Sequence, residues 1–473
     1  MIDLKNELDW FELILKVRFR DFVYEQTGKL NNDPSISAYQ SYEEIPLPIL
    51  AEHSPYTQLI NRYQFNLIER ACIILALLPH IKPQLLDIFF TENALYNRTF
   101  TQFGGYKGIA HKGFLPTGET AAFIFASEDL EKRKQVIDLF SPLHAFNQNR
   151  ILKLGEAPDH EPALSGPLLI SPEYLSLITI GKAYEPPYSS KFPAKKLTSA
   201  LDWEDLIIPQ KIRIELEHLL NWLKLEKTLM HGHDLVKRLR PGYRAMFYGE
   251  PGTGKTLAVT LLGKATGRSV YRVDLSQLVS KYIGETEKNL ANVFDMAEGK
   301  NWILFFDEGD VLFGKRTETR DSNDKHANQQ TAYLLQRIES FTGLFILATN
   351  RRIDIDSAFS RRFESIIHFF QPGYEDRLQL WKGLFNHSWD TSDIDWEQVS
   401  ADFLIPGGMM VNVLRYVTIK ALARNSNKIL PPYLLEALKK EYEKAEKAWP
   451  STSKRLEKQV LSRMHEQHSN GSN

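Results

Sequence analysis

The chain contains the glycine-rich segment Gly249-Glu250-Pro251-Gly252-Thr253-Gly254-Lys255-Thr256, which lies between an apolar run and a helical pattern ending at Ala265. Glycines let the backbone curl so that successive amides point at one anion, and the N-terminus of the following helix adds its positive dipole end. Lys255 is expected to reach the β- and γ-phosphates of a nucleotide, and Thr256 to ligate Mg²⁺. The segment therefore predicts an ATP-binding loop between a strand and a helix.

Two carboxylates follow the apolar run of residues 303–306. Asp307 and Glu308 are expected at the carboxyl end of a buried parallel strand, beside the phosphate loop. Asp307 would hold the Mg²⁺ shell, and Glu308 would orient and deprotonate the attacking water. Asn350 closes a third apolar strand, where its amide would meet water and the γ-phosphate, unless it only forms a turn.

The pattern of the second half of the chain predicts an α/β fold. Apolar strands are expected at residues 245–248, 269–273, 302–306, 344–349 and 366–369, with helical periodicity between most of them. Such alternation is typical of a parallel sheet with helices on both faces. Only helical patterns follow residue 375, so we expect a small helical lid after the sheet.

Adjacent arginines, Arg361 and Arg362, precede the last predicted strand. Such a pair is most often a solvated basic surface. However, the order of phosphate loop, Asp-Glu strand, Asn strand and Arg-Arg turn resembles the AAA+ ATPases, specifically the branch with the protein-remodelling enzymes spastin and katanin. The similarity spans residues 203–424.

The resemblance implies a role for each of these residues. Lys255 and Thr256 would be the Walker A residues, and Asn350 the first sensor. Asp307 and Glu308 would be the Walker B pair. Arg361 and Arg362 would be arginine fingers that complete the site of a neighbouring subunit, which implies a ring, usually a hexamer.

Two further loops are similar to pore loops of that family. In Ser280-Lys281-Tyr282-Ile283-Gly284-Glu285-Thr286-Glu287, Tyr282 stands at the position that grips a polypeptide, flanked by Lys281 and Ile283. Composition alone would make Tyr282 a half-exposed loop aromatic. Residues 317–328 match the place of the second pore loop, or are an ordinary charged loop.

The second sensor of the family would fall on Pro406-Gly407-Gly408-Met409-Met410. The family often has Gly-Ala-Asp or Gly-Ala-Arg there, so no arginine of the same subunit is credited with a role. A nucleotide contact by the Gly408 backbone remains as an expectation. The Walker B strand continues as Asp-Glu-Gly-Asp, where alanine or isoleucine is commoner at the third position.

Before the α/β pattern we expect a mainly helical, winged-helix-like domain at residues 1–185 and a linker at residues 186–198. Helical spacing runs over residues 59–90, with breaks at Pro79 and Pro83, and a glycine-studded segment at residues 104–118 suggests a β-ribbon. The linker contains Pro-Pro-Tyr-Ser-Ser-Lys-Phe-Pro. The ATPase core is then expected at residues 199–370, the lid at 371–450 and a helix with a polar tail at 451–473.

A second resemblance concerns possible partners. Residues 111–120, the Phe-Pro-Ala linker at 192–194 and Trp203-Glu204-Asp205-Leu206 look like bacterial single-ring AAA+ ATPases. These are often encoded with phage-tail-like extracellular contractile injection systems, so a component of such a system is an expected partner.

Composition excludes several classes of protein. The 58 basic and 59 acidic residues leave a formal charge of -1, so we expect no nucleic-acid partner. No apolar run approaches the roughly 18 residues of a membrane helix, and the N-terminus lacks a signal pattern. Cys72 is the single cysteine, which excludes a disulfide framework, and we expect a cytoplasmic location.

The leading hypothesis is a ring-forming, Mg²⁺-dependent ATPase that uses pore loops on a protein substrate. One alternative is a nucleotide-gated scaffold that assembles on a partner without threading a polypeptide. A winged-helix DNA-binding regulator is a third, but residues 1–200 carry 20 basic against 23 acidic groups, which speaks against it.

Overall fold

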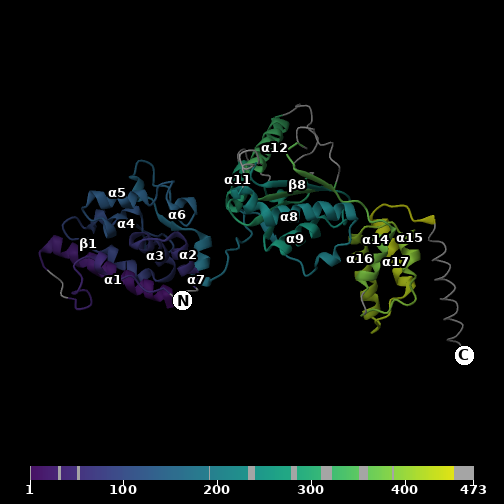
Figure 1. Cartoon of the computed structure of the whole chain (residues 1–473), viewed down its shortest axis with the longest axis horizontal. Helices are drawn as coiled ribbons and strands as arrows, with labels where there is room; N and C mark the ends of the chain where they lie inside the picture. The colour runs from purple at the N-terminus through teal and green to yellow at the C-terminus, as the bar shows by residue number, and fades with distance from the viewer. Residues whose placement is uncertain are drawn as a thin grey trace. The chain divides into compact units, whose positions relative to one another are not determined.

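The computed structural model divides into two compact units, Met1–Glu185 and Pro186–Asn473 (Figure 1). Its described residues are 2–29, 33–50, 54–190, 192–232, 240–278, 285–309, 322–350, 361–385 and 388–451.

The first unit is mainly helical. Its helices are α1 (Ile2–Thr27), α2 (Pro55–Tyr63), α3 (Leu67–Ile81), α4 (Gly118–Phe125), α5 (Leu130–Asp138), α6 (Ala145–Gln148) and α7 (Pro172–Ile180). Three two-stranded antiparallel sheets join them: β1 (Glu92–Asn93) with β2 (Arg98–Thr99), β3 (Tyr106–Lys107) with β4 (Phe114–Leu115), and β5 (Leu152–Leu154) with β6 (Leu168–Ile170). The predicted β-ribbon at residues 104–118 is thus confirmed in the pairing of β3 with β4.

Helix α3 forms the centre of this unit, because the side chains of residues 71–78 are all buried. The predicted helix break at Pro79 is wrong, since α3 continues through Pro79 to Ile81. The free energy gained by burying the preceding two turns exceeds the cost of the one backbone hydrogen bond that a proline removes. Among the described residues, no helix on its own has the length and apolar character to cross a membrane. Only α3 taken with the 3₁₀ segment η2 (Pro83–Phe90) meets that criterion, and the pair is bent by 100°.

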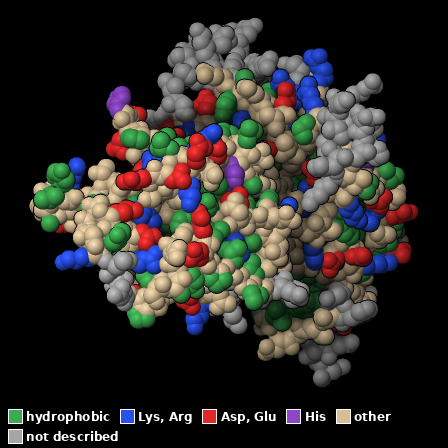
Figure 2. Space-filling view, turned by 60° about the vertical axis from the view of Figure 1, so that its left-hand side comes forward, with side chains coloured by type: hydrophobic (Ala, Val, Ile, Leu, Met, Phe, Trp, Pro, Cys, Tyr) green, Lys and Arg blue, Asp and Glu red, His purple; other side chains and the backbone are tan. Residues whose placement is uncertain are grey.

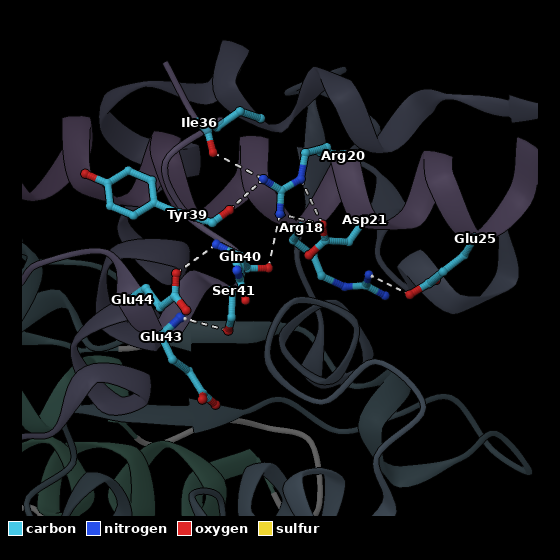
Figure 3. Close-up of polar contacts among 10 residues, drawn as sticks. All are labelled: Arg18, Arg20, Asp21, Glu25, Ile36, Tyr39, Gln40, Ser41, Glu43 and Glu44. Carbon is cyan, nitrogen blue, oxygen red and sulfur yellow. Dashed lines mark hydrogen bonds and ion pairs between the residues drawn. The ribbon is translucent and has the colours of Figure 1, made fainter. Parts of the chain in front are cut away.

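Two charged residues of α1, Arg20 and Glu7, bind other segments of this unit. Arg20 donates to the carbonyl oxygens of Ile36 (3.1 Å), Tyr39 (2.7 Å) and Gln40 (3.2 Å), as Figure 3 shows. At the other end of α1, the fully buried carboxylate of Glu7 pairs with Arg70 of α3 and accepts a 2.9 Å hydrogen bond from the Tyr56 hydroxyl of α2. These polar contacts fix α1 against α2, α3 and the segment before η1 (Tyr42–Glu44).

The second unit contains a six-stranded sheet in the order β12-β8-β11-β10-β9-β7. Its strands are β7 (Ala194–Leu197), β8 (Tyr243–Tyr248), β9 (Ser269–Val273), β10 (Trp302–Phe306), β11 (Leu344–Thr349) and β12 (Ser365–His368). All neighbouring pairs are parallel except β7 with β9. The five predicted strands are therefore confirmed as a parallel sheet, with β8 and β12 each beginning slightly earlier than expected.

Helices cover both faces of this sheet (Figure 1). On one face, α8 (Gln210–Gly232) and α9 (Lys255–Thr266) pack on alternate strand residues such as Phe247, Phe305 and Ile346. On the other, α10 (Leu275–Leu278), α11 (Glu285–Ala297) and α12 (Ser322–Ser340) pack on the intervening residues such as Met246, Phe306 and Phe345. Burial on both faces explains why the central strands β8, β10 and β11 are mostly apolar.

The segment expected as a linker differs from the prediction. Residues 194–197 form the edge strand β7, whose register pairs Ala194 with Val273 and Leu197 with Val270. The prolines that precede β7 led to the prediction of a linker. However, proline is tolerated before the first residue of an edge strand, so it does not prevent β7 from pairing. The sheet therefore begins within the predicted linker of residues 186–198.

The helical lid consists of α14 (Tyr374–Leu384), α15 (Trp396–Asp402), α16 (Gly407–Leu422) and α17 (Pro431–Lys444). These helices pack around their own core, in which Trp381, Val413 and Leu438 are fully buried.

Acidic, basic and hydrophobic side chains are interspersed over the face shown in Figure 2.

Candidate functional site

The phosphate loop connects β8 to α9, as the sequence predicts. Three of its glycines, Gly249, Gly252 and Gly254, have φ angles of 149°, 78° and 99°. Side chains strongly disfavour that region of φ. A Cβ on Gly249 would also lie 2.1 Å from the carbonyl oxygen of Phe369. The loop conformation therefore depends on glycine at these positions.

Lys255, the first residue of α9, is buried and joins two strand ends through its ammonium group. Its Nζ donates to the carbonyl oxygens of Gly249 (2.7 Å) and Glu250 (3.0 Å) within the loop. It also donates to Oδ1 of Asn350 at 3.0 Å, directly after β11. Because β11 lies beside β8, Asn350 sits next to the loop. The amino group and the amide predicted to act together are therefore adjacent.

Thr256 and Asp307 approach each other across the same edge of the sheet. The Thr256 hydroxyl donates to Oδ2 of Asp307 over 3.5 Å. Two oxygens bound side by side to one Mg²⁺ lie about 2.9 Å apart, given metal–oxygen bonds of about 2.0–2.1 Å. A small movement would thus let both bind one ion. Among the described residues no group of three or more His, Cys, Asp or Glu side chains is arranged to hold a metal. The oxygens of Thr256 and Asp307 are ligands of the kind that Mg²⁺ takes together with phosphates and water.

Glu308 has an uncommon backbone conformation, with φ of 58°. Its N–H donates to Oδ1 of Asp307 at 3.1 Å, and its side chain is exposed. Non-glycine residues in this region cost free energy and are concentrated at functional sites. A Cβ on the next residue, Gly309, would lie 2.7 Å from Cδ1 of Leu347, so a side chain there would require Leu347 to shift. Packing against β11 therefore favours a small residue at the third position of the Asp-Glu-Gly-Asp sequence.

Arg361 and Arg362 lie near the amino ends of the strands, whereas the phosphate loop lies at their carboxyl ends. They directly precede β12, which runs parallel to β8, so they are at the amino ends of the strands. The four residues of β12, at about 3.3 Å each, span about 13 Å between the two edges. Arg361 is exposed, and Arg362 is half-buried and paired with Glu339 of α12.

Comparison with known proteins agrees with this geometry. Residues 245–371 match the family model "ATPase family associated with various cellular activities (AAA)". This match contains the phosphate loop, both carboxylates, Asn350 and the two arginines. Residues 245–371 form an AAA ATPase domain.

Several known proteins that are similar to this domain have names linked to proteasomes. Over 149 residues, the chain is 37% identical to the proteasome-activating nucleotidase of Methanococcus vannielii, which covers 30% of this chain and 37% of that protein. It is 32% identical over 169 residues to the nucleotidase of the same name from Archaeoglobus fulgidus, covering 34% and 42%. It is 32% identical over 166 residues to the 26S proteasome regulatory subunit 7 homolog B of Arabidopsis thaliana, covering 33% and 36%. The chain thus spans less than half the length of these relatives.

Arg244, at the start of β8 and directly before the matched residues 245–371, is a structural residue that sequence reasoning missed. Its side chain is 2% exposed and pairs with Glu364 at 3.1 Å. It also donates to backbone carbonyls at the end of α12, including those of Ile338 (3.1 Å) and Glu339 (2.6 Å). A charged residue before an apolar strand was the only sequence signal. Arg244 connects the strand leading into the phosphate loop with the turn that carries Arg361 and Arg362.

The lid contacts the phosphate loop directly. Gly408 lies in the first turn of α16, and its N–H donates to the carbonyl oxygen of Gly252 at 3.0 Å. The Glu250 carboxylate accepts from the Gln371 amide and lies 3.8 Å from Nζ of Lys447, just beyond α17. The predicted contact of Gly408 with nucleotide stays a prediction, but Gly408 does adjoin the loop.

The predicted pore-loop residues Lys281, Tyr282 and Ile283 lie outside the described residues, as do residues 310–321. The second predicted pore loop, at residues 317–328, is partly helical, because α12 begins at Ser322. The predicted C-terminal helix at residues 451–473 also lies outside the described residues, apart from residue 451.

Proposed function

We propose that this chain is a Mg²⁺-dependent ATPase that forms a ring and remodels protein substrates. The convergence of Lys255, Asn350, Thr256 and Asp307 on one edge of the sheet carries this proposal. Each comes from the carboxyl end of a parallel strand or from the helix that follows, where nucleotides bind in α/β proteins. A loop of exposed amides, a buried ammonium and two oxygen ligands together match a nucleoside triphosphate with its metal.

Each of these residues would have a separate role in ATP hydrolysis. Lys255 would exchange its present carbonyl partners for the β- and γ-phosphate oxygens. Glu308 would accept the proton of the attacking water, and the Asn350 amide would orient that water against the γ-phosphate. Thr256 and Asp307 would hold Mg²⁺, which when bound neutralises the charge that develops on the phosphoryl oxygens.

The position of the two arginines supports the proposal of a ring. Arg361 and Arg362 lie about 13 Å or more from their own phosphate edge, by the length of a four-residue strand. An arginine that stabilises the transition state must touch the transferred phosphate. We therefore infer that these residues act on a neighbouring subunit, in a closed ring and by resemblance a hexamer.

Protein remodelling is proposed on the relatives. Their names link them to proteasomes, so a polypeptide is the proposed substrate, gripped by Lys281, Tyr282 and Ile283. Membership of the spastin and katanin branch, a cytoplasmic location and a contractile injection system as partner stay predictions from the sequence. A nucleotide-gated scaffold that does not thread a polypeptide is the alternative.

The proposal can be tested with two variants, Lys255→Ala and Glu308→Gln. The control is Lys264→Ala, a residue on the same helix as Lys255. Lys255→Ala should lose ATP binding because the loop loses its ammonium group. Glu308→Gln should bind ATP normally but fail to hydrolyse it. Lys264→Ala, whose side chain instead pairs with Asp202, should behave as the unmodified protein. ATP affinity and phosphate release would be measured for all four proteins.

Two results would contradict the proposal. Wild-type turnover by Glu308→Gln would exclude the assigned base, and wild-type affinity of Lys255→Ala would exclude the assigned phosphate site. Binding and assembly of the unmodified protein without phosphate release would favour the scaffold.

A further inference from the structure

We propose that Gly408 of the lid positions a phosphate-binding amide of the loop, the N–H of Thr253, and that only glycine can do so at this position. Gly408 would act through Gly252 and is therefore a positioning residue. The inference rests on the proposed binding of ATP, and it adds a specific contribution of the lid to the binding of the phosphates.

The argument begins with the hydrogen bond from the Gly408 N–H to the carbonyl oxygen of Gly252, at 3.0 Å. This carbonyl belongs to the same peptide unit as the N–H of Thr253. In a planar trans peptide the C=O and N–H bonds point in opposite directions. By holding the carbonyl toward α16, Gly408 therefore turns the Thr253 N–H away from the lid, toward the inside of the loop where phosphates are expected.

Within the part of the chain that the structure describes, the bond from Gly408 is the hydrogen bond that restrains this peptide unit. Gly252 has a φ of 78°, and glycine samples a wider range of backbone conformations than any other residue. The Thr253 hydroxyl donates to the Glu250 carbonyl at 2.8 Å, which restrains the side chain of Thr253 rather than its amide. The bond from Gly408 is thus the contact that selects one orientation of the Gly252–Thr253 peptide.

Space at position 408 allows only glycine. A Cβ on Gly408 would lie 2.8 Å from Cα of Gly252. The colliding atom belongs to the backbone, so no side chain can rotate out of the way. Any larger residue must push α16 and the loop apart, which would lengthen the 3.0 Å hydrogen bond.

The neighbouring glycine provides a matched comparison. A Cβ on Gly407 would lie 3.7 Å from the Gly252 carbonyl oxygen and 3.8 Å from the methyl groups of Leu380, which are ordinary van der Waals contacts. Both glycines lie in the first turn of α16, where alanine favours the helix more than glycine does. The two substitutions are chemically the same but differ in their effect on the loop.

A second contact keeps the lid close to the loop. The Glu250 carboxylate lies between the Gln371 amide and Nζ of Lys447, the latter 3.8 Å away. Glu250 is 54% exposed, so this ion pair is weak. This ion pair keeps the region after α17 near the loop. It does not contact the Gly252–Thr253 peptide, whose orientation depends on Gly408.

The test compares Gly408→Ala with Gly407→Ala in the full chain, using ATP, ADP and adenosine as ligands. Gly408→Ala should bind ATP and ADP about tenfold to a hundredfold more weakly, as expected for one lost hydrogen bond to a charged group. Its affinity for adenosine, which has no phosphate, should stay within about twofold. Gly407→Ala should bind all three ligands as the unmodified protein does. Without nucleotide, Gly407→Ala should melt no earlier than the unmodified protein.

Several outcomes would overturn the inference. Normal ADP affinity of Gly408→Ala, an equal loss in Gly407→Ala, or an equal loss of adenosine binding would each do so. A measurement on the unmodified protein avoids any folding defect: ADP but not adenosine should slow hydrogen exchange of the Thr253 amide, and unchanged exchange would refute the assignment. If the unmodified protein bound no ATP, the proposed function itself would fail first.

Discussion

Replacing Arg244 with methionine should strongly destabilise the second unit while keeping most of the volume of the side chain. Arg244 is 2% exposed. Its guanidinium donates to four backbone carbonyls and one carboxylate, those of Pro241 (2.8 Å), Ile338 (3.1 Å), Glu339 (2.6 Å), Phe341 (3.2 Å) and Glu364 (3.1 Å). Methionine can replace none of these donors.

The size of the effect follows from the groups left behind. Removing one partner of a buried, hydrogen-bonded ion pair costs about 3–5 kcal/mol, and carbonyls without a partner add to the cost unless water reaches them. Glu364 can turn toward solvent, because its side chain is 38% exposed, so we expect the lower part of this range. A change of 1 kcal/mol moves Tm by about 2–4 °C in domains of 150–250 residues, which predicts a decrease of about 6–12 °C.

Thermal unfolding with hydrogen exchange measures this change and assigns it to a unit. Protection should fall in β8 and at the end of α12, and not in the first unit. Arg240→Met is the matched control, because Arg240 is 73% exposed and 4.0 Å from the same Glu339, and surface pairs contribute less than about 1 kcal/mol. A decrease below about 2 °C for Arg244→Met, or one equal to that of the control, would refute the reasoning.

Three further predictions concern other parts of the chain. Alanine at Arg361 or Arg362 should slow ATP turnover by about a thousandfold or more at unchanged ATP affinity, measured as steady-state phosphate release; normal turnover of both variants would exclude a shared site. Glu7→Gln should lower the free energy of unfolding of the first unit by about 3 kcal/mol, because it breaks the buried pair with Arg70; an unchanged denaturation midpoint would contradict this. Burial raises the pKa of the Cys72 thiol, so a thiol reagent at pH 8.5 should modify it only after unfolding. Since the unfolded chain ionises above about pH 8.5 and the folded chain does not, the first unit should lose stability as the pH rises beyond that value; rapid modification of the folded protein would show that Cys72 is accessible.

The central strands β8, β10 and β11 could be predicted from the sequence because each contains an apolar run that is buried on both faces. Phe305 and Phe306 illustrate this, since they point into opposite helical layers and are both fully buried. The phosphate loop could be predicted for a related reason. Its glycines, lysine and threonine are contiguous, so their geometry depends on local φ and ψ angles and on the helix that starts at Lys255.

Edge strand β7 could not be predicted, because an edge strand has one partner and needs no apolar run. Its pattern of burial leaves Lys195 and Lys196 exposed, so composition alone resembles a linker. Pairing with β9 depends on backbone groups, which every residue except proline carries.

The sequence by itself determined the type of sheet, the phosphate loop and the order in which the site residues occur. Only the tertiary structure decided which distant residues meet: Arg244 with Glu364, 120 positions apart, and Gly408 with Gly252. The physical reason is that both contacts depend on packing between elements far apart in the chain. A buried guanidinium needs several acceptors from different segments. The first turn of α16 approaches the phosphate loop so closely that a Cβ on Gly408 would lie 2.8 Å from Cα of Gly252.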